Sequence, residues 1–247
     1  MANFMKKGKA AQQMHKKAEA ETEAKKQASE NQVNRFWMPN DSERQITFLD
    51  GEVDADGVLN ANSFWEHQLK LGGHWRNWYP CTQLEEECPI CEGGDNASLV
   101  TIFTIIDHEP FTSKKTGKTY VNERKLLAVK REVYKRLQKI AAKRGGLAGI
   151  TFDVSRGGDK SPGSGELFEF VEKRTPAEIA KAYGLKADDV KPFDYDKVIV
   201  YNNAKKLREM GFGTEGGSGG KAIGSADGDA LSGGGSKGDV EDYDNEV

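Results

Sequence analysis

All three cysteines of the chain fall within the run Tyr79-Pro-Cys-Thr-Gln-Leu-Glu-Glu-Glu-Cys-Pro-Ile-Cys-Glu-Gly-Gly94. They are Cys81, Cys88 and Cys91, and the last two form a Cys-Pro-Ile-Cys knuckle followed by two glycines. A knuckle of this kind turns the backbone so that two thiolates converge on one tetrahedral ion, usually zinc. The run therefore predicts a structural metal site inserted into the fold.

A tetrahedral site needs a fourth ligand, and two histidines, His67 and His74, lie just upstream of the cysteines. The alternative is three free thiols, or one disulfide and a spare thiol. A redox Cys-x-x-Cys is a weaker alternative, because no βαβ pattern surrounds the knuckle and a third cysteine lies close by. We expect one zinc ion held by three thiolates and one imidazole.

A length of 247 residues predicts one compact domain, or one domain with appendages. The first thirty residues are charged rather than apolar, so no signal peptide is expected. The longest apolar stretch, 99–106, is too short for a bilayer, which needs roughly 20 residues. The chain is expected to be soluble and intracellular, where a reducing environment keeps thiols available for a metal.

The formal net charge of −3 hides a strong asymmetry along the chain. Residues 1–30 carry seven lysines and four glutamates, whereas 213–247 carry two lysines and eight acidic residues. Residues 112–144 hold twelve Lys and Arg against two Glu, a local charge of +10. The mildly acidic total is therefore no argument against a nucleic-acid partner, because the position of the charge decides.

Composition divides the chain into three parts. Residues 1–34 form a basic N-terminal arm, predicted to be an exposed helix or a disordered segment. Residues 35–212 form the core, which includes the zinc loop 80–95. Residues 213–247 form a Gly/Ser-rich acidic tail that cannot fold alone.

Short strand signals dominate the core. Strands are expected at 44–50, 64–71, 74–79, 99–106, 121–129, 150–154, 167–171 and 198–201. Helices are expected at 131–144, from a capping box at Thr175 to Gly184, and at 204–210. This is a mainly β fold with added helices (α+β), and it suits an OB-fold-like barrel with the zinc loop inserted between early strands.

The expected strand 64–71 alternates, so that Trp65 and His67 share one face. Gly72-Gly73 then forms a hairpin turn into the next strand. On this parity Trp65 is expected in the core. Trp75 and Trp78 point to opposite faces, so at most one of them need be buried.

The sequence does not favour an enzyme. It has no Gly-x-Ser-x-Gly and no His-Glu-x-x-His. Thr116-Gly-Lys-Thr119 imitates the end of a phosphate loop, but Thr112 stands where the first glycine must be. We therefore expect a binding protein rather than a catalyst.

Basic and aromatic residues are interleaved in two segments, 64–79 and 111–144. Single-stranded nucleic acid is held by such mixtures, since cations follow the phosphates while bases stack on aromatic rings. A solvated helix face for 131–144 and core packing for the tryptophans remain alternatives. The residues expected to contact DNA are Lys70, Trp75, Arg76, Trp78, Lys114, Lys115, Lys118, Tyr120, Arg124, Lys130 and Arg131.

The tail ends in a cluster of acidic residues around one aromatic. A tethered polyanion can compete with nucleic acid for a basic groove and then engage partner proteins, although a merely solubilising tail is the alternative. The residues expected to bind partners are Asp239, Glu241, Asp242, Tyr243, Asp244 and Glu246.

The order His67, Cys81, Cys88-Pro-Ile-Cys91 resembles that of the zinc-containing single-stranded DNA-binding (helix-destabilising) proteins of tailed bacteriophages. The resemblance covers about 35–212 and the plan of arm, core and tail. It favours His67 over His74 as fourth ligand, because that family's histidine lies about a dozen residues before its first cysteine. The loop from Cys81 to Cys88 is shorter than in the T-even phage member of that family, and the N-terminal arm differs from the arm of that protein.

The resemblance implies a protein that coats single-stranded DNA without sequence preference in DNA replication, recombination and repair. It implies recruitment of a polymerase, helicase loader or recombinase through the acidic tail, in the host cytoplasm if the protein is phage-encoded. Self-association on DNA remains open. Two alternatives are a zinc-knuckle regulator that binds double-stranded DNA and a phage structural or assembly protein with a zinc staple. The regulator is disfavoured because 97–106 predicts a strand, not a finger-type helix.

Overall fold

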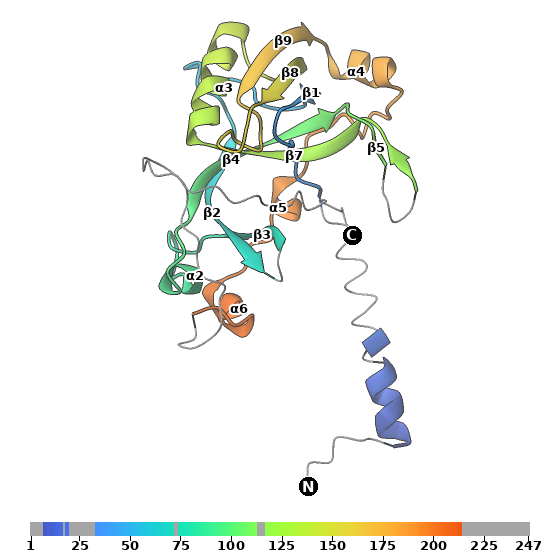
Figure 1. Cartoon of the computed structure of the whole chain (residues 1–247), viewed down its shortest axis with the longest axis vertical. Coiled ribbons are helices and arrows are strands. Elements are labelled where there is room, and N and C mark those ends of the chain that lie inside the picture. The colour runs from blue at the N-terminus through green and yellow to red at the C-terminus, as the bar shows by residue number, and fades with distance from the viewer. Residues whose placement is uncertain (1–6, 17, 20–32, 72–73, 113–116, 214–247) are drawn as a thin grey trace.

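A computed structural model describes residues 7–16, 18–19, 33–71, 74–112 and 117–213 (Figure 1). The strands are β1 (Ser42–Phe48), β2 (Asn62–Leu71), β3 (His74–Pro80), β4 (Ser98–Asp107), β5 (Phe111–Thr112), β6 (Thr119–Tyr120), β7 (Glu123–Lys130), β8 (Ile150–Arg156) and β9 (Leu167–Lys173). The helices are α2 (Pro89–Glu92), α3 (Arg131–Arg144), α4 (Pro176–Tyr183), α5 (Tyr195–Val198) and α6 (Ala204–Glu209). The protein is mainly antiparallel β sheet with several helices, the α+β class expected from the sequence.

Strand β4 is the centre of a seven-stranded sheet, in which six strands follow the order β3-β2-β4-β1-β8-β9 and the seventh, β7, pairs with β4. One edge of β4 pairs with β2 along its first half and with β1 along its second half. The other edge pairs with β7 over eight residues. This explains the nearly continuous apolar composition of β4, because a strand buried on both faces cannot alternate.

The sheet does not close into a barrel within the described ranges, because no strand pairing there joins β9 to β7. Instead, the segment 34–38 lies in the gap. The Phe36 amide donates to the Leu126 carbonyl at 2.9 Å, and the Met38 amide donates to the Gly163 carbonyl at 2.9 Å. The backbone of this short segment therefore bonds to β7 on one side and to the loop before β9 on the other.

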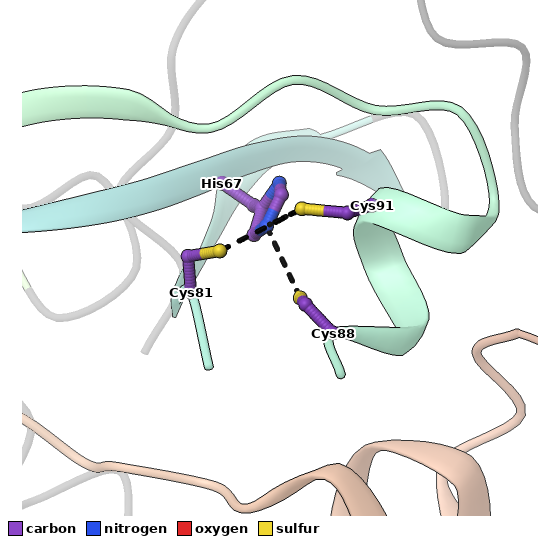
Figure 2. Close-up of side chains that lie close together, drawn as sticks. All are labelled: His67, Cys81, Cys88 and Cys91. Carbon is purple, nitrogen blue, oxygen red and sulfur yellow. Dashed lines mark hydrogen bonds between the residues drawn. The ribbon is translucent and has the colours of Figure 1, made fainter. Parts of the chain in front are cut away.

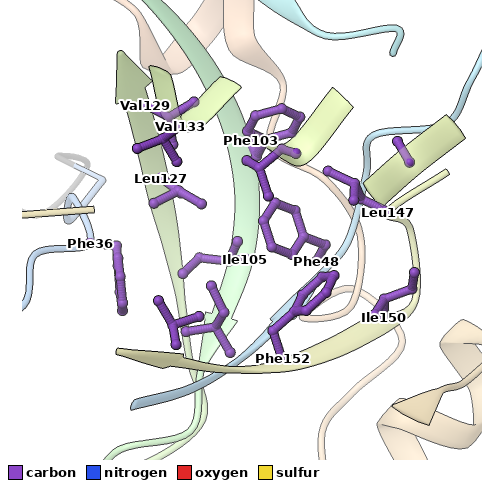
Figure 3. Close-up of a cluster of buried hydrophobic side chains, with 14 of the residues drawn as sticks. Phe36, Phe48, Phe103, Ile105, Leu127, Val129, Val133, Leu147, Ile150 and Phe152 are labelled. Carbon is purple, nitrogen blue, oxygen red and sulfur yellow. The ribbon is translucent and has the colours of Figure 1, made fainter. Parts of the chain in front are cut away.

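The main core lies between the sheet and α3 (Figure 3). Phe48 is in edge-to-face contact with Phe103 and Phe152, at ring-centroid distances of 5.5 and 5.6 Å. Helix α3 has the bounds that its apolar spacing predicted, and it buries Val133, Leu137 and Ala141 against this core. It ends at Gly145 in the left-handed region, with φ of 68°, as a helix C-terminus commonly does.

In the C-terminal part of the core, the two expected helices form but the expected strand does not. Thr175 and Glu178 form the predicted capping box of α4, which ends at Gly184. The strand expected at 198–201 is wrong, because the helical turn α5 ends at Val198 and residues 199–201 belong to no helix or strand. The amides of Lys197 and Val198 bond back to the Asp194 carbonyl, and no sheet strand takes up this segment.

The β2–β3 hairpin carries α2 away from the main core, and α6 lies beside α2 (Figure 1). Helix α5 lies between the part formed by β2, β3, α2 and α6 and the rest of the sheet. In the arm, residues 9–16 are helical and almost entirely exposed. Among the described residues, no helix has the length and apolarity that a membrane crossing requires.

Candidate metal centre

The hairpin and the following loop bring four side chains together (Figure 2). His67 projects from β2, and Cys81 follows the last residue of β3. The Cys81 amide donates to the Trp65 carbonyl at 2.8 Å, which extends the hairpin ladder and places Cys81 near His67. Cys88 directly precedes α2 and Cys91 lies within it, so the knuckle presents both sulfurs to the imidazole.

The four possible ligand atoms lie within 4.8 Å of one another, and three of their separations fit a tetrahedral set. His67 Nε2 is 3.4 Å from Cys88 Sγ and 3.5 Å from Cys91 Sγ, and Cys81 Sγ is 3.6 Å from Cys91 Sγ. Ligands bonded to zinc at about 2.0–2.3 Å lie roughly 3.3–3.8 Å from one another in a tetrahedron. The cluster can therefore hold a metal ion, with a ligand set compatible with zinc. The side chain of the alternative ligand, His74, lies outside the described residues.

Asp95 orients the imidazole and was not found from the sequence. Its Oδ2 accepts a hydrogen bond from His67 Nδ1 at 2.6 Å, which fixes the tautomer and leaves Nε2 facing the sulfurs. His67 is fully buried. Gly94, with φ of 89°, turns the chain after α2 so that Asp95 reaches back. The sequence signal that could have pointed to this residue is its place directly after Gly93-Gly94.

The thiols are poised for a cation. Burial favours a neutral Cys88, but backbone amides of Cys91 and Thr82 outweigh it and lower the pKa of this thiol to about 6. Burial, together with the neighbouring Cys81 and Cys88, raises the pKa of Cys91 to about 12. Burial also raises the pKa of Cys81. Three thiolates cannot coexist here alone, so a bound cation would supply the missing positive charge.

Replacing Asp95 with asparagine is expected to weaken metal binding about 10- to 100-fold, because the ligand imidazole loses a charged partner. Competition against a chromophoric chelator measures this affinity. Asp56→Asn, an isosteric change at an exposed position, is the control and should leave the affinity unchanged. Equal affinities for both variants would show that Asp95 does not support the ligand.

Several residues expected to contact DNA already have partners within the protein. The Arg35 guanidinium lies over the Trp78 ring at 4.3 Å and pairs with buried Glu66. Arg124 donates to the carbonyls of Asp188 and Lys191 at 3.0 and 2.8 Å. Lys118 lies over the Tyr120 ring at 4.9 Å. These residues position chain segments as well as carrying charge.

The remaining candidates divide into three groups. Lys70, Lys130 and Arg131 are exposed. Lys114, Lys115, the side chains of Trp75 and Arg76, and the tail residues lie outside the described residues. Trp65 was expected in the core, but it is 42% exposed. The metal loop, here residues 80–95, contacts His67 through Cys88, Cys91 and Asp95. Of the two residues that share this face of β2, His67 is buried and Trp65 is not.

A hollow of about 390 Å³ lies between the sheet and residues 192–195. Phe193 and Tyr195 line it, and the Arg124 guanidinium lies over the Phe193 ring at 4.3 Å. Burial raises the pKa of Asp50 to about 6, although hydrogen bonds from Tyr195 and Thr104 oppose the shift. The full lining is Asp50, Asn60, Ala61, Asn62, Ile102, Pro192, Phe193 and Tyr195. Sequence reasoning missed this site.

A second hollow, of about 550 Å³, has the opposite character, since Asp41, Glu43 and Glu166 line it. Its one cationic residue, Arg156, is engaged by the carbonyls of Met38 and Ser161. This acidic hollow is unsuited to a polyanion.

Comparison with known proteins finds no matching family model, no matching curated protein and no matching solved structure.

Proposed function

We propose that the chain is a zinc-containing single-stranded DNA-binding protein of the OB-fold type. In this proposal it coats single-stranded DNA without sequence preference during replication, recombination and repair. The function rests on where the hollow beside Phe193 lies in the fold, and the metal centre is structural.

The order of the strands supports an OB-type arrangement. Strands β7, β4, β1, β8 and β9 pair in that sequence, and α3 is inserted between β7 and β8. A five-stranded, partly open Greek-key barrel with one helix between later strands has this plan. A closed barrel would have no opening between its two end strands. Here the segment 34–38 occupies that opening, because it bonds to β7 and to the loop before β9.

The position of the hollow carries the proposal. OB-folds bind oligonucleotides on the face of their second and third strands and in the connection between the first two. In this chain that connection is 49–97, and it supplies Asp50 and residues 60–62 of the hollow. Phe193 offers a ring for base stacking, and Arg124 beside it offers positive charge near a phosphate.

Zinc would be held by His67 and the three cysteines, with no position left open for a substrate. It would tie the metal loop to the hairpin, as a structural zinc does, and would supply no catalysis. The absence of catalytic motifs agrees with a binding role, and the proposed protein is not an enzyme.

The likeness to the phage family extends the proposal to partners. The acidic tail, with Asp239, Asp242 and Tyr243 among its residues, would recruit replication or recombination proteins such as a polymerase, a helicase loader or a recombinase. It would compete with DNA for the basic surface when no strand is bound. The exposed Lys130 and Arg131 at the start of α3 belong to that surface.

Titration with poly(dT), followed by tryptophan fluorescence, tests the function. Sequence-tolerant binding is expected, with an affinity that falls steeply as salt increases. Phe193→Ala should weaken binding about 5- to 150-fold, which corresponds to about 1–3 kcal/mol for one stacked base. Phe170→Ala is the matched control, because Arg144 covers that ring as Arg124 covers Phe193, but Phe170 lies on the edge strand β9 and does not line the hollow.

Two results would contradict the proposal. A preference for one duplex sequence would support a double-stranded DNA regulator. No binding to either form of DNA would support a structural or assembly role. Equal affinity of the Phe193 and Phe170 variants would leave DNA binding intact but remove the hollow as its site.

A further inference from the structure

Residues 193–213, here called the strap, connect the sheet to the metal loop. The strap begins at β4, where the Phe193 amide donates to Thr104 Oγ1 at 2.9 Å. The Tyr195 hydroxyl donates to the Asp50 carboxylate and is 2.9 Å from Thr104 Oγ1. These contacts hold Phe193 and Tyr195 over the hollow described above.

The strap ends on the metal loop through apolar packing. Leu207 of α6 is fully buried, and it packs in one cluster with Cys88 and Ile90. Phe212 meets the Tyr79 ring edge-to-face at a centroid distance of 5.2 Å. The surface that covers Leu207 therefore includes the sulfur-bearing knuckle itself.

Polar contacts with three glutamates of the metal loop lie around this packing. The Arg208 guanidinium makes two hydrogen bonds to Glu92, both of 2.8 Å. The Ala204 amide donates to Glu86 Oε1 at 2.7 Å, and the Tyr201 hydroxyl donates to Glu85 Oε2 at 3.2 Å. Helix α6 has six residues and is too short to be stable alone, so these contacts hold it in place.

We propose that α6 is a metal-dependent latch. The metal loop has few buried apolar residues of its own, and the ion fixes the knuckle on which Leu207 packs. When the ion leaves, the knuckle loosens and α6 undocks, so that only the contacts with Thr104 and Asp50 still hold Phe193 and Tyr195 over the hollow. Leu207 and Arg208 are thus positioning residues for the hollow. The effect on DNA rests on the proposed function, whereas the docking of α6 does not.

The coupling has to be reciprocal. If the ion stabilises the docked latch, the docked latch strengthens the hold on the ion by the same factor. DNA would bind the docked form, so the apparent dissociation constant rises as the docked fraction falls. A latch docked one tenth of the time would raise that constant about tenfold.

Hydrogen exchange of the full chain tests the latch directly. In the zinc-loaded protein, amides of 204–213 should be protected, and chelation should speed their exchange at least about tenfold. Helix α4 is the internal control, because it docks on the sheet away from the metal loop and should keep its protection. Unchanged exchange in α6, or equal loss of protection in α4, would overturn the proposal.

Variants separate the latch from the ion. Leu207→Ala and the surface variant Arg208→Glu should each speed α6 exchange while one zinc ion per chain is retained, and adding Glu92→Arg to Arg208→Glu should restore protection. Both single variants should bind poly(dT) more weakly, by about five- to tenfold. Released α6 with unchanged DNA affinity would overturn the positioning role. If the unaltered protein binds no DNA, the proposed function fails, but the exchange result still decides whether the latch exists.

Discussion

Replacing Cys88 with serine is expected to release the metal ion and to lower the melting temperature by roughly 8–16 °C. Structural zinc contributes about 10–16 kcal/mol in small zinc-finger peptides, and a loss of about a third of that is near 4 kcal/mol. For a chain of this size, 1 kcal/mol corresponds to roughly 2–4 °C. Metal analysis and a thermal melt measure the two effects.

Two comparisons make the Cys88 result decisive. Chelator should lower the melting temperature of the unaltered protein by a similar amount and should leave Cys88→Ser unaffected. Gln83→Ala is the control, because this exposed side chain contacts Cys91 in the same loop without belonging to the tetrad. If chelator leaves the melting temperature of the unaltered protein unchanged, the cluster holds no stabilising ion.

Acid should weaken the metal-dependent part of the stability. Binding displaces protons from Cys91 and Cys81, whose pKa values lie above the usual thiol range in the metal-free protein. The competition from protons therefore grows as the pH falls, and the difference between loaded and chelated protein should shrink.

The cluster of His67 and the three cysteines was predictable because three of the four residues lie within eleven residues and the knuckle has a known geometry. Asp95 was not predictable in the same way. It lies 28 residues after His67 and meets it only because β2 and the end of the metal loop are adjacent in the fold. Spacing along the chain predicts the cysteines that cluster in one loop. It does not predict a hydrogen-bond partner, such as Asp95, that only the fold brings to His67.

The same contrast holds for the secondary structure. The capping box of α4 and the period of α3 are local signals, and both were right. Residues 198–201 have the β-branched composition of a strand, yet Tyr195 is fixed to Asp50, α5 ends at Val198, and residues 199–201 pair with no strand. Tertiary contacts thus override a short local preference. Alternation placed Trp65 on the face of His67, but it could not show that only His67 would be buried.

Replacing Asp107 with alanine is expected to lower the free energy of unfolding by about 3–5 kcal/mol. Asp107 is fully buried at the end of β4, where it accepts hydrogen bonds from Arg44 at 2.8 Å and Lys125 at 3.0 Å. Removing one partner of a buried ion pair leaves an uncompensated charge, which is the reason for the large effect. Denaturant unfolding measures the difference.

Asp153→Ala is the control for the same substitution on the exposed face of β8, where the side chain accepts one hydrogen bond from Gln45. It should change the free energy of unfolding by no more than about 0.5 kcal/mol. Adding Lys125→Met to Asp107→Ala should recover part of the loss, because the stranded ammonium is removed. Similar stabilities for the two alanine variants would refute the buried network.

This network also limits which cations can serve the proposed DNA surface. Lys125 counts toward the +10 charge of 112–144, but it is buried against Asp107 and cannot reach a phosphate. Lys125→Met alone should therefore lower stability without changing the salt dependence of poly(dT) binding. Lys130→Met, at an exposed position five residues later, should reduce the magnitude of that salt slope by about 0.7 with little effect on stability. The opposite pattern would mean that Lys125, not Lys130, meets the strand.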